Sequence, residues 1–515
     1  MLKTSSLFIL FCFLFNQVQS QILPEEGSKL NYRLIGFSFP NRENTDSFTI
    51  EIAKGIITNS NSFKKNIIKS YSGNKNRIIA EVPFWGEDYT WRIIYTKGKF
   101  KGTLNGFHHF STLIIPEVDT NKMRLRILHA AEKYKDAFVL LDNNKVMYDM
   151  NGSSVWFLPD NLRMGPSASD LKLSPAGTLT MLIGTQAYEI NYNGLVLWKA
   201  PNTGKISGDT TENYNHEFTR LSNGHYMILG NENVFWRPAT SIDNNNILNS
   251  DTLARHRNMF FGTIIEYDKM GNVVWSWKSS NYFLESDINY CNPLNHPLDL
   301  HARDIMDTHE NAFYFDEKNK NIYAGYKAVN RILKVKYPEG NVTNVYGNLY
   351  KFGVPQGEDL FCGQHSISVS KSGNLILFDN HFCDREAASR VIILKEPEPN
   401  DSEIKKVWEF PFTYDDSKTA QNCKGGNVVE LADSSLFVCM GIIYSKLFII
   451  TMNKHELWSA VPEVWNDTEK KWNINSQYRS SIIENRQQLE KMIWNNEEPI
   501  FNAADQKNSN QTKYK

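Results

Sequence analysis

Several features that would point to a familiar chemistry are missing from this sequence. Among its 515 residues are 6 cysteines, with no Cys-x-x-Cys pair and no Cys/His spacing typical of a zinc site. It has no Gly-rich phosphate loop, so a nucleotide donor has no visible binding motif. The formal net charge is −1, which gives no sign of a nucleic-acid partner. We therefore expect no Cys-based metal site, no nucleotide cofactor and no nucleic acid, and any attraction for an anion must be local.

Long apolar runs are also scarce, and the clearest one lies at the N-terminus. Residues 7–15 are apolar and follow Lys3, and Val18-Gln19-Ser20 resembles a signal-peptide cleavage site. We expect residues 1–20 to be removed and the protein to be exported, to the periplasm or beyond. The alternative is an uncleaved anchor, but the run is too short to span a bilayer. The next candidate, residues 437–452, is broken by Lys446 and is predicted to form two strands.

Cleavage of the signal peptide would leave five cysteines in a compartment that permits disulfides. An odd number leaves at least one thiol free if the others pair within the chain. Which of them pair is left open by the sequence. These residues are Cys291, Cys362, Cys383, Cys423 and Cys439.

The two ends of the mature chain differ from its middle. Residues 21–120 alternate short apolar and polar runs around Trp91, which predicts a small antiparallel β-sandwich of immunoglobulin or fibronectin type. Residues 461–515 contain SQYRSSIIENRQQLEKMIW, which has helical composition, followed by a polar tail. We expect a short C-terminal helix, a disordered tail and no catalytic residues there.

A repeat fills residues 125–460. Each unit reads as strand, tight turn, strand, and then the same again with an aromatic residue at the end. Six second halves and five clear first halves predict an all-β fold, a six-bladed β-propeller. The first halves begin at Asp170, His216, His309, His365 and Asn427. The terminal tryptophans are expected to pack between blades: Trp156, Trp198, Trp275, Trp408 and Trp458.

Three of the five first strands begin with histidine: His216, His309 and His365. Long insertions fall at the end of each blade where first strands begin, so these loops and the histidines are predicted to share one face. Because the first strand of a blade lines the central channel, the imidazoles should converge at its mouth. Such a cluster can bind a metal, act as nucleophile and general acid–base, or bind an anion.

A lysine near this mouth favours an anionic substrate over a divalent metal. Lys327 follows the second strand of the His309 unit and should reach the same mouth. Arg331 is a second candidate cation, although it falls in or near the third strand of that unit.

These motifs resemble those of the bacterial arylsulfate sulfotransferases over about residues 30–460. The matching features are His216 followed by L-x-N-G, the D-x-H-x-N of residues 307–311, Gln364-His365 followed by GNLILFDN, and Ser389-Arg390. The resemblance implies an exported six-bladed propeller preceded by a β-sandwich. It also implies transfer of a sulfuryl group from a phenolic sulfate ester to a phenol without a nucleotide or other cofactor.

The resemblance also implies roles for individual residues. His365 would be the nucleophile that becomes sulfated, in a two-step ping-pong exchange. His216 and His309 would bind sulfuryl oxygens and move the phenol proton. The arginine of the family aligns with Lys327, which keeps the charge but loses the bidentate fork. Ser366 is a second departure, because the family commonly has Asp after the histidine.

Three further residues are candidate substrate-binding groups: Asn311, Gln364 and Arg331. The expected partners are a small phenolic sulfate and a phenol acceptor, with a homodimer left open. Two other functions stay open from the sequence: a non-catalytic propeller that binds an anionic or glycan ligand at the same mouth, and a metal-dependent hydrolase or lyase.

Overall fold

The structure is a computed structural model. It describes residues 22–40, 47–97, 101, 106–236, 242–243, 246–247, 257–283, 307–347, 349–351, 354–356, 360–381, 387–397, 403–413, 421–422 and 424–500. The chain divides into two compact units, Met1–Leu113 and Ile114–Lys515. Both are built from β-strands. The helices of the described residues are short: α1 (Ser60–Lys65), α2 (Asp160–Arg163), α4 (Arg486–Ile493) and the 3-10 turns η1 (Pro116–Val118), η2 (Glu132–Tyr134) and η3 (Ser279–Asn281).

The N-terminal unit contains a five-stranded sheet and a two-stranded sheet. Phe37 of the smaller sheet packs edge-on against Trp91 of the larger one, with ring centroids 4.9 Å apart, and both side chains are fully buried. Trp91 thus occupies the centre of a two-sheet unit, the arrangement expected of a sandwich. The larger sheet has the order β1 (Ser28–Leu30), β7 (His108–Thr112), β6 (Asp88–Tyr95), β3 (Phe48–Lys54) and β4 (Ile67–Gly73), and the smaller pairs β2 (Leu34–Ser38) with β5 (Arg77–Glu81).

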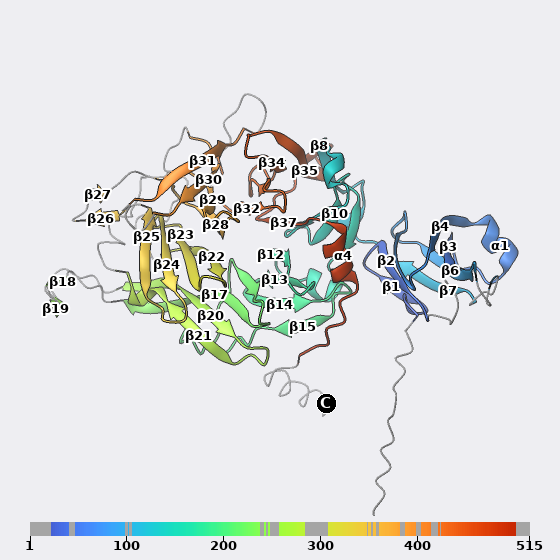
Figure 1. Cartoon of the computed structure of the whole chain (residues 1–515), viewed down its shortest axis with the longest axis horizontal. Coiled ribbons are helices and arrows are strands. Elements are labelled where there is room, and N and C mark those ends of the chain that lie inside the picture. Colours follow the sequence, from blue (N-terminus) through green and yellow to red (C-terminus); the bar gives the residue numbers. More distant parts are fainter. Residues whose placement is uncertain are drawn as a thin grey trace, which may run out of the picture. The chain divides into compact units, whose positions relative to one another are not determined.

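The second unit contains six sheets of at least four strands, which Figure 1 shows arranged around a common centre. Labelled first strands lie toward that centre and labelled fourth strands lie outside. The first strands are β37 (Ser480–Ile483), β12 (Ala168–Leu173), β16 (Phe218–Arg220), β22 (Glu310–Asp316), β28 (His365–Val369) and β32 (Asn427–Glu430). The fourth strands are β11 (Ser154–Phe157), β15 (Val196–Lys199), β21 (Val273–Lys278), β25 (Val342–Gly347), β31 (Lys405–Pro411) and β35 (Glu456–Asn466).

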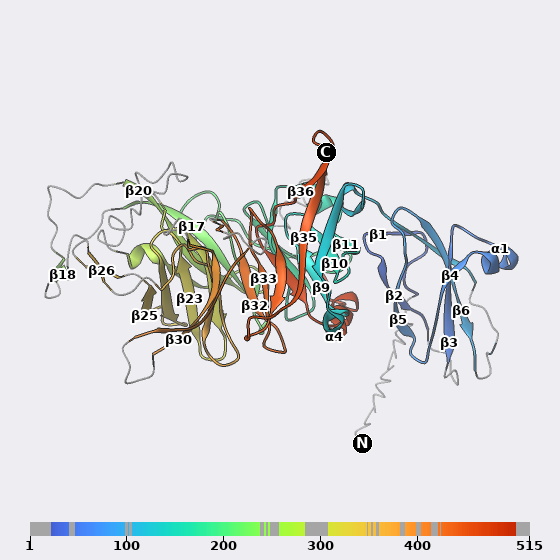
Figure 2. The same ribbon diagram turned by 90° about the horizontal axis from the view of Figure 1, so that it is seen from above.

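The middle strands of these sheets are buried because each sheet packs against neighbours on both faces. All five residues of β13 (Leu179–Ile183) and of β29 (Leu375–Asp379) are buried, and four of the five in each strand are apolar. Figure 2 shows the same sheets turned by 90°. The second strands are β9 (Phe138–Leu141), β13 (Leu179–Ile183), β17 (Tyr226–Trp236), β23 (Asn321–Tyr326), β29 (Leu375–Asp379) and β33 (Leu436–Cys439). The third strands are β10 (Val146–Asp149), β14 (Gln186–Ile190), β20 (Arg257–Tyr267), β24 (Arg331–Lys336), β30 (Arg390–Lys395) and β34 (Leu447–Ile450).

Short additional strands complete the unit. Strands β8 (Met123–His129) and β36 (Lys471–Ile474) both pair with β35 and extend the last sheet. Two hairpins are formed by β18 (Ile242–Asp243) with β19 (Asn246–Ile247) and by β26 (Leu349–Lys351) with β27 (Val354–Gln356). The predicted two strands within residues 437–452 correspond to most of β33 and to β34. Among the described residues, no helix is long and apolar enough to cross a membrane.

Strand β37 supplies the first half that the repeat lacked. It pairs antiparallel with β9, so the innermost strand of one sheet comes from the C-terminal end of the chain. The expectation of a helix across SQYRSSIIENRQQLEKMIW is therefore wrong for its first part, and only α4 is helical. The four residues SSII form a strand because their partner β9 is buried and apolar, which local composition does not reveal.

The terminal tryptophans connect successive sheets, as expected. In four of them the indole Nε1 donates a hydrogen bond to a backbone carbonyl in the outer turn of the next sheet. The bond from Trp458 to Met150 runs from the last sheet to the first, whereas the indole nitrogen of the buried Trp198 has no hydrogen-bond partner within the described residues. The four bonds are Trp156 to Tyr192 at 2.7 Å, Trp275 to Pro338 at 2.8 Å, Trp408 to Met452 at 2.8 Å and Trp458 to Met150 at 3.0 Å.

Candidate active site

The backbone adopts the same uncommon conformation at the start of several first strands. Asp170, His216 and His309 have φ values of 56°, 56° and 55°, in the left-handed region that few non-glycine residues occupy. In the next sheet this conformation falls at Ser366, with φ 47°, directly after His365. Backbone of this kind concentrates at functional sites because it directs a side chain away from the regular strand direction.

The structure brings the three predicted histidines together. The His216 and His309 rings have centroids 5.4 Å apart. The ring of Tyr478 lies 6.0 Å from His216 and 6.2 Å from His365, so it contacts both sides of the cluster. Three strands from different repeats therefore present their imidazoles to one small region at the inner ends of the sheets.

Burial and nearby cations keep two of the imidazoles neutral. Burial lowers the pKa of His365 well below its ordinary value, and the positive charges of Lys327, His309 and Arg479 act in the same direction. Burial likewise lowers the pKa of His216, with the same three neighbours contributing. An uncharged imidazole carries a nitrogen lone pair, so both rings are suited to attack an electrophile or accept a proton.

Lys327 lies at this cluster, as the sequence predicted. It follows β23, and its backbone N–H donates to the carbonyl of His309 at 2.9 Å. Its charge acts on both His216 and His365, which places the ammonium group near both rings. The site thus has a permanent cation beside neutral nitrogen bases, an environment that attracts an anion.

The three candidate substrate-binding residues form a buried brace. Gln364 donates through Nε2 to the carbonyls of Tyr326 at 3.2 Å and Arg331 at 2.9 Å. The backbone carbonyl of Gln364 accepts a hydrogen bond from Asn311 Nδ2 at 2.9 Å. Arg331 is the first residue of β24 and contributes its backbone carbonyl to this brace. Asn311 Oδ1 and Gln364 Oε1 are both buried acceptors without a hydrogen-bond partner among the described residues.

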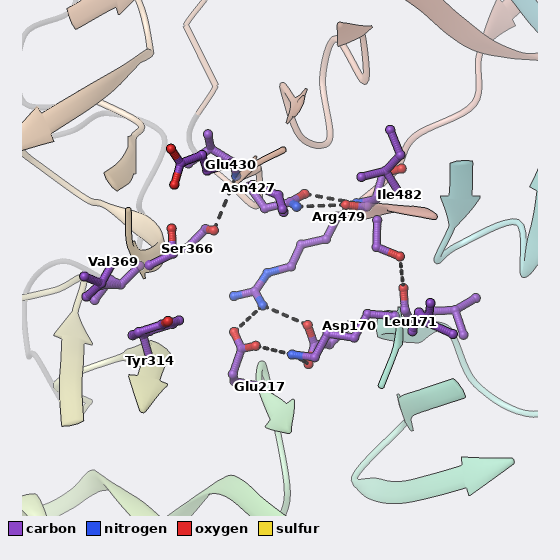
Figure 3. Close-up of a pocket in the computed structure, with 18 of the residues that line it drawn as sticks. Asp170, Leu171, Glu217, Tyr314, Ser366, Val369, Asn427, Glu430, Arg479 and Ile482 are labelled. Atoms are coloured by element: carbon purple, nitrogen blue, oxygen red, sulfur yellow. Dashed lines mark hydrogen bonds and ion pairs between the residues drawn. The ribbon is translucent and has the colours of Figure 1, made fainter. Parts of the chain in front are cut away.

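Arg479 was missed by the sequence reasoning, which placed no catalytic residue after position 460. It precedes β37 and is 5% exposed. Its Nη1 atom lies 2.6 Å from Glu217 Oε2 and 3.2 Å from Asp170 Oδ1, and its Nη2 donates to the carbonyl of Asn311 at 2.8 Å. Figure 3 shows its side chain reaching across to Glu217 and Asp170. Arg479 therefore ties together residues of three sheets beside the histidines.

The carboxylates around Arg479 are shared with a lysine. Lys172 contacts Asp170 Oδ2 at 2.8 Å and also forms an ion pair with Glu217. Burial raises the pKa of Asp170 to about 6, and the negative charge of Glu217 adds to this effect. Burial alone would raise the pKa of Glu217 as well, but Lys172 and Arg479 hold it below its ordinary value. Glu217 is therefore the carboxylate that stays ionised beside Arg479.

A cavity of about 450 Å³ lies next to the histidine cluster. It is lined by the inner strands β12, β28, β32 and β37 and by the residues that follow two of the histidines, Glu217 and Ser366. The histidines themselves do not line it. Arg479 does, so this side chain borders the cavity (Figure 3) and also acts on the cluster through its charge.

One signal in the sequence could have found Arg479. Six second halves were matched by five first halves, so one first strand had to come from elsewhere. A short apolar strand that follows a polar residue near the C-terminus fits that position: Tyr478-Arg479 followed by SSII. Tyr478 OH is buried with no hydrogen-bond partner among the described residues, and burial raises the pKa of Tyr478 to about 12.

The structure describes only some of the cysteines for which predictions were made. Cys439 is a buried free thiol, which agrees with an odd number of cysteines. Residues 1–20 and Cys291, Cys383 and Cys423 lie outside the described residues. In the part of the chain that the structure describes, no group of three or more His, Cys, Asp or Glu side chains is arranged to hold a metal ion.

Comparison with known families identifies the chain. The family model described as Arylsulfotransferase (ASST) matches residues 125–410, more than half of the sequence. The protein therefore belongs to the arylsulfotransferase family. None of the curated proteins matches it.

Solved structures resemble it only distantly. A protein of unknown function from Bacteroides caccae has 12% identity and a TM-score of 0.39, covering 70% of this chain and 99% of its own. The periplasmic gluconolactonase PpgL of Pseudomonas aeruginosa has 9% identity and a TM-score of 0.31, covering 68% and 82%. Apo AztD from Citrobacter koseri has 8% identity and a TM-score of 0.31, covering 85% and 98%.

Proposed function

We propose that this protein transfers a sulfuryl group from a phenolic sulfate ester to a phenol, through a sulfated His365. The observation that carries the proposal is the convergence of three imidazoles and Lys327 at one place in a chain of the arylsulfotransferase family. Family membership implies phenolic substrates. The neutral, buried imidazole of His365 beside permanent cations is the arrangement that an anionic electrophile requires.

The first step moves the sulfuryl group to the enzyme. The lone pair of a His365 ring nitrogen attacks sulfur, so the N–S bond forms while the bond from sulfur to the phenolic oxygen breaks. The phenolate takes the electron pair of that bond, and His309 supplies its proton. Lys327 stabilises the sulfuryl oxygens, as cations do in phosphoryl transfer. Arg479 supplies a second positive charge that acts on His365.

The second step reverses the first with a new phenol. Its hydroxyl loses a proton to a neutral imidazole of the cluster, its oxygen bonds to sulfur, and the N–S bond breaks to restore His365. No water or cofactor enters either step, so atoms and charge balance in a ping-pong cycle.

The finer features of the fold belong to the same proposal. We infer that the six sheets are the blades of a closed six-bladed propeller, supported by β37 and by the bond from Trp458 to Met150. The N-terminal apolar segment is proposed as a cleaved signal peptide that directs export, to the periplasm or beyond. Disulfides among the remaining cysteines would suit that compartment.

The test measures transfer from 4-nitrophenyl sulfate to a panel of phenols, with release of 4-nitrophenol followed by absorbance. Wild-type protein should release 4-nitrophenol faster when an acceptor phenol is present, and His365→Ala should abolish release. A matched control is His455→Ala, because His455 is an exposed histidine in an outer turn. This variant should retain wild-type activity.

Mass spectrometry of the protein mixed with donor alone should find one sulfuryl group on the peptide that contains His365. An adduct on a different histidine would reassign the nucleophile. If wild type and His365→Ala both bind the sulfate ester saturably and neither turns it over, the result would instead favour a binding propeller. Turnover lost on chelation would favour a metal-dependent hydrolase.

A further inference from the structure

Each histidine of the cluster is held at the same ring nitrogen by the side-chain oxygen of an Asn or Asp. His365 Nδ1 lies 2.6 Å from Asn380 Oδ1, and His216 Nδ1 lies 2.6 Å from Asn215 Oδ1. His309 Nδ1 lies 3.3 Å from Asp307 Oδ2. The pattern recurs in three different sheets, although the partner follows the second strand in one case and precedes the histidine in the others.

The orientation of the Asn380 amide is fixed by its other end. Asn380 Nδ2 donates to the carbonyl of Asn422 at 2.8 Å and to that of Gly425 at 3.1 Å, and the residue is fully buried. An amide nitrogen donates and an amide oxygen accepts, so the oxygen must be the atom that faces His365. A flipped amide would point its two N–H groups at the ring and its oxygen at two carbonyls.

This orientation determines where the proton of His365 resides. Asn380 Oδ1 is an acceptor, and the second contact of Nδ1 is another acceptor, the carbonyl of Gly363 at 3.2 Å. Nδ1 must therefore carry the hydrogen when the ring is neutral. The lone pair is left on Nε2, and the ring hydrogen bonds found in the described part of the chain are all at Nδ1.

The surrounding backbone holds Asn380 in place. Ser389 Oγ donates to the carbonyl of Asn380 at 2.8 Å, and the preceding Asp379 accepts from the backbone N–H of Cys362 at 2.8 Å. Arg390 Nε contacts Asp379 Oδ2 at 2.9 Å. The backbone on both sides of Asn380 is thus held by hydrogen bonds, so its amide is a rigid support for the imidazole.

We infer that Asn380 is a positioning residue that fixes the proton of His365 on Nδ1 and presents Nε2 as the nucleophilic atom. The role of Nε2 as the nucleophile rests on the proposed function, whereas the position of the proton on Nδ1 does not. The partners also differ in charge: Asp307 holds the His309 ring through a carboxylate, whereas Asn380 and Asn215 hold their rings through neutral amide oxygens.

The wild-type tautomer can be measured without any substrate. Protein labelled with ¹⁵N-histidine gives distinct NMR signals for protonated and unprotonated ring nitrogens, and the His365 signals are those that disappear in His365→Ala. The expected result is a protonated Nδ1 and an unprotonated Nε2. The opposite tautomer overturns the inference. A protein with the expected tautomer but without transfer activity would retain the inference and lose the proposed function.

Two variants test the part played by Asn380. Asn380→Ala should give a mixture of tautomers, and an unchanged Nδ1–H tautomer would assign the role to the Gly363 carbonyl and overturn the inference. Asn380→Asp places a carboxylate on Nδ1. It should raise the acid limb of kcat/KM for 4-nitrophenyl sulfate by about 1 to 3 pH units. The charged and titratable groups already facing His365 are Lys327, His309, Arg479 and Tyr478.

The control for added charge is Asn374→Asp in the turn that follows β28. It introduces the same carboxylate in the same sheet, at the end remote from His365, and should leave the acid limb unmoved. An acid limb that moves equally in both variants would overturn the inference. If Asn380→Asp does not fold, the spectra of wild type and Asn380→Ala decide the question.

Discussion

Arg479 and Glu217 form an ion pair with 2.6 Å between Nη1 and Oε2, and the two residues adjoin the first strands of two different sheets. Arg479 precedes β37 and Glu217 precedes β16. Both side chains are largely buried, at 6% and 12% exposed. A pair of this kind holds the C-terminal strand to the middle of the chain and sets the charge beside the histidines.

Replacing Arg479 should therefore destabilise the protein more than replacing its partner. Arg479→Met leaves Lys172 as the one cation paired with Glu217 and Asp170 among the described residues, so we expect a loss of about 3–5 kcal/mol of unfolding free energy. Glu217→Gln keeps the pair of Arg479 with Asp170 and should cost less. Urea unfolding of both variants at neutral pH measures the difference. A larger loss in Glu217→Gln would show that Arg479 is not the central group.

The repeat made most of the second unit predictable. Alternating apolar strands with tight turns at fixed positions determine four-stranded sheets, and the excess of second halves indicated the number of sheets. The role of β37 could not be predicted from local sequence. SSII is four residues long, and its identity as a strand depends on pairing with β9, more than 330 residues earlier in the chain.

The site residues that belong to the repeat could be predicted from the sequence, and the others could not. His216 and His309 occupy one repeat position and His365 lies one residue before the equivalent Ser366, so their convergence follows from the symmetry of the sheets although the match is offset by one residue. Asn380 and Arg479 act on that cluster from a strand end and from the C-terminal segment. No spacing in the sequence relates them to the histidines, because their contacts depend on how side chains fill the space between sheets.

The indole hydrogen bond that links the last sheet to the first should contribute measurably to stability. Trp458→Phe keeps an aromatic ring but removes the donor to the Met150 carbonyl, and we expect a loss of at least about 1 kcal/mol. Trp198→Phe is the matched control, because that buried indole nitrogen has no hydrogen-bond partner in the part of the chain that the structure describes. Thermal or urea unfolding compares them. An equal loss in both variants would mean that ring volume, and not the hydrogen bond, accounts for the effect.

The donor half-reaction should tolerate acid better than an ordinary histidine would allow. Burial and the neighbouring cations lower the pKa of His365, so its ring binds a proton only at a pH below the usual value of about 6.5. The neutral nucleophile therefore persists as the pH falls through that value. With 4-nitrophenyl sulfate, whose leaving group needs little protonation, kcat/KM should stay level to below pH 6.5 and fall only at lower pH. A midpoint at or above 6.5 would contradict this assignment.

Lys327 offers the sharpest test of electrostatic stabilisation, because this chain has lysine where its family resemblance suggests arginine. Lys327→Met removes a cation that acts on His216 and His365, and kcat/KM for an aryl sulfate should fall about 100- to 1000-fold. Lys327→Arg keeps the charge and adds a bidentate fork, so it should retain activity and lower KM for the donor. Lys318→Met, in an exposed turn between β22 and β23, is the control and should change neither constant. Equal activity of Lys327→Met and wild type would remove Lys327 from the site and leave Arg479 as the cation that acts on the transferred group.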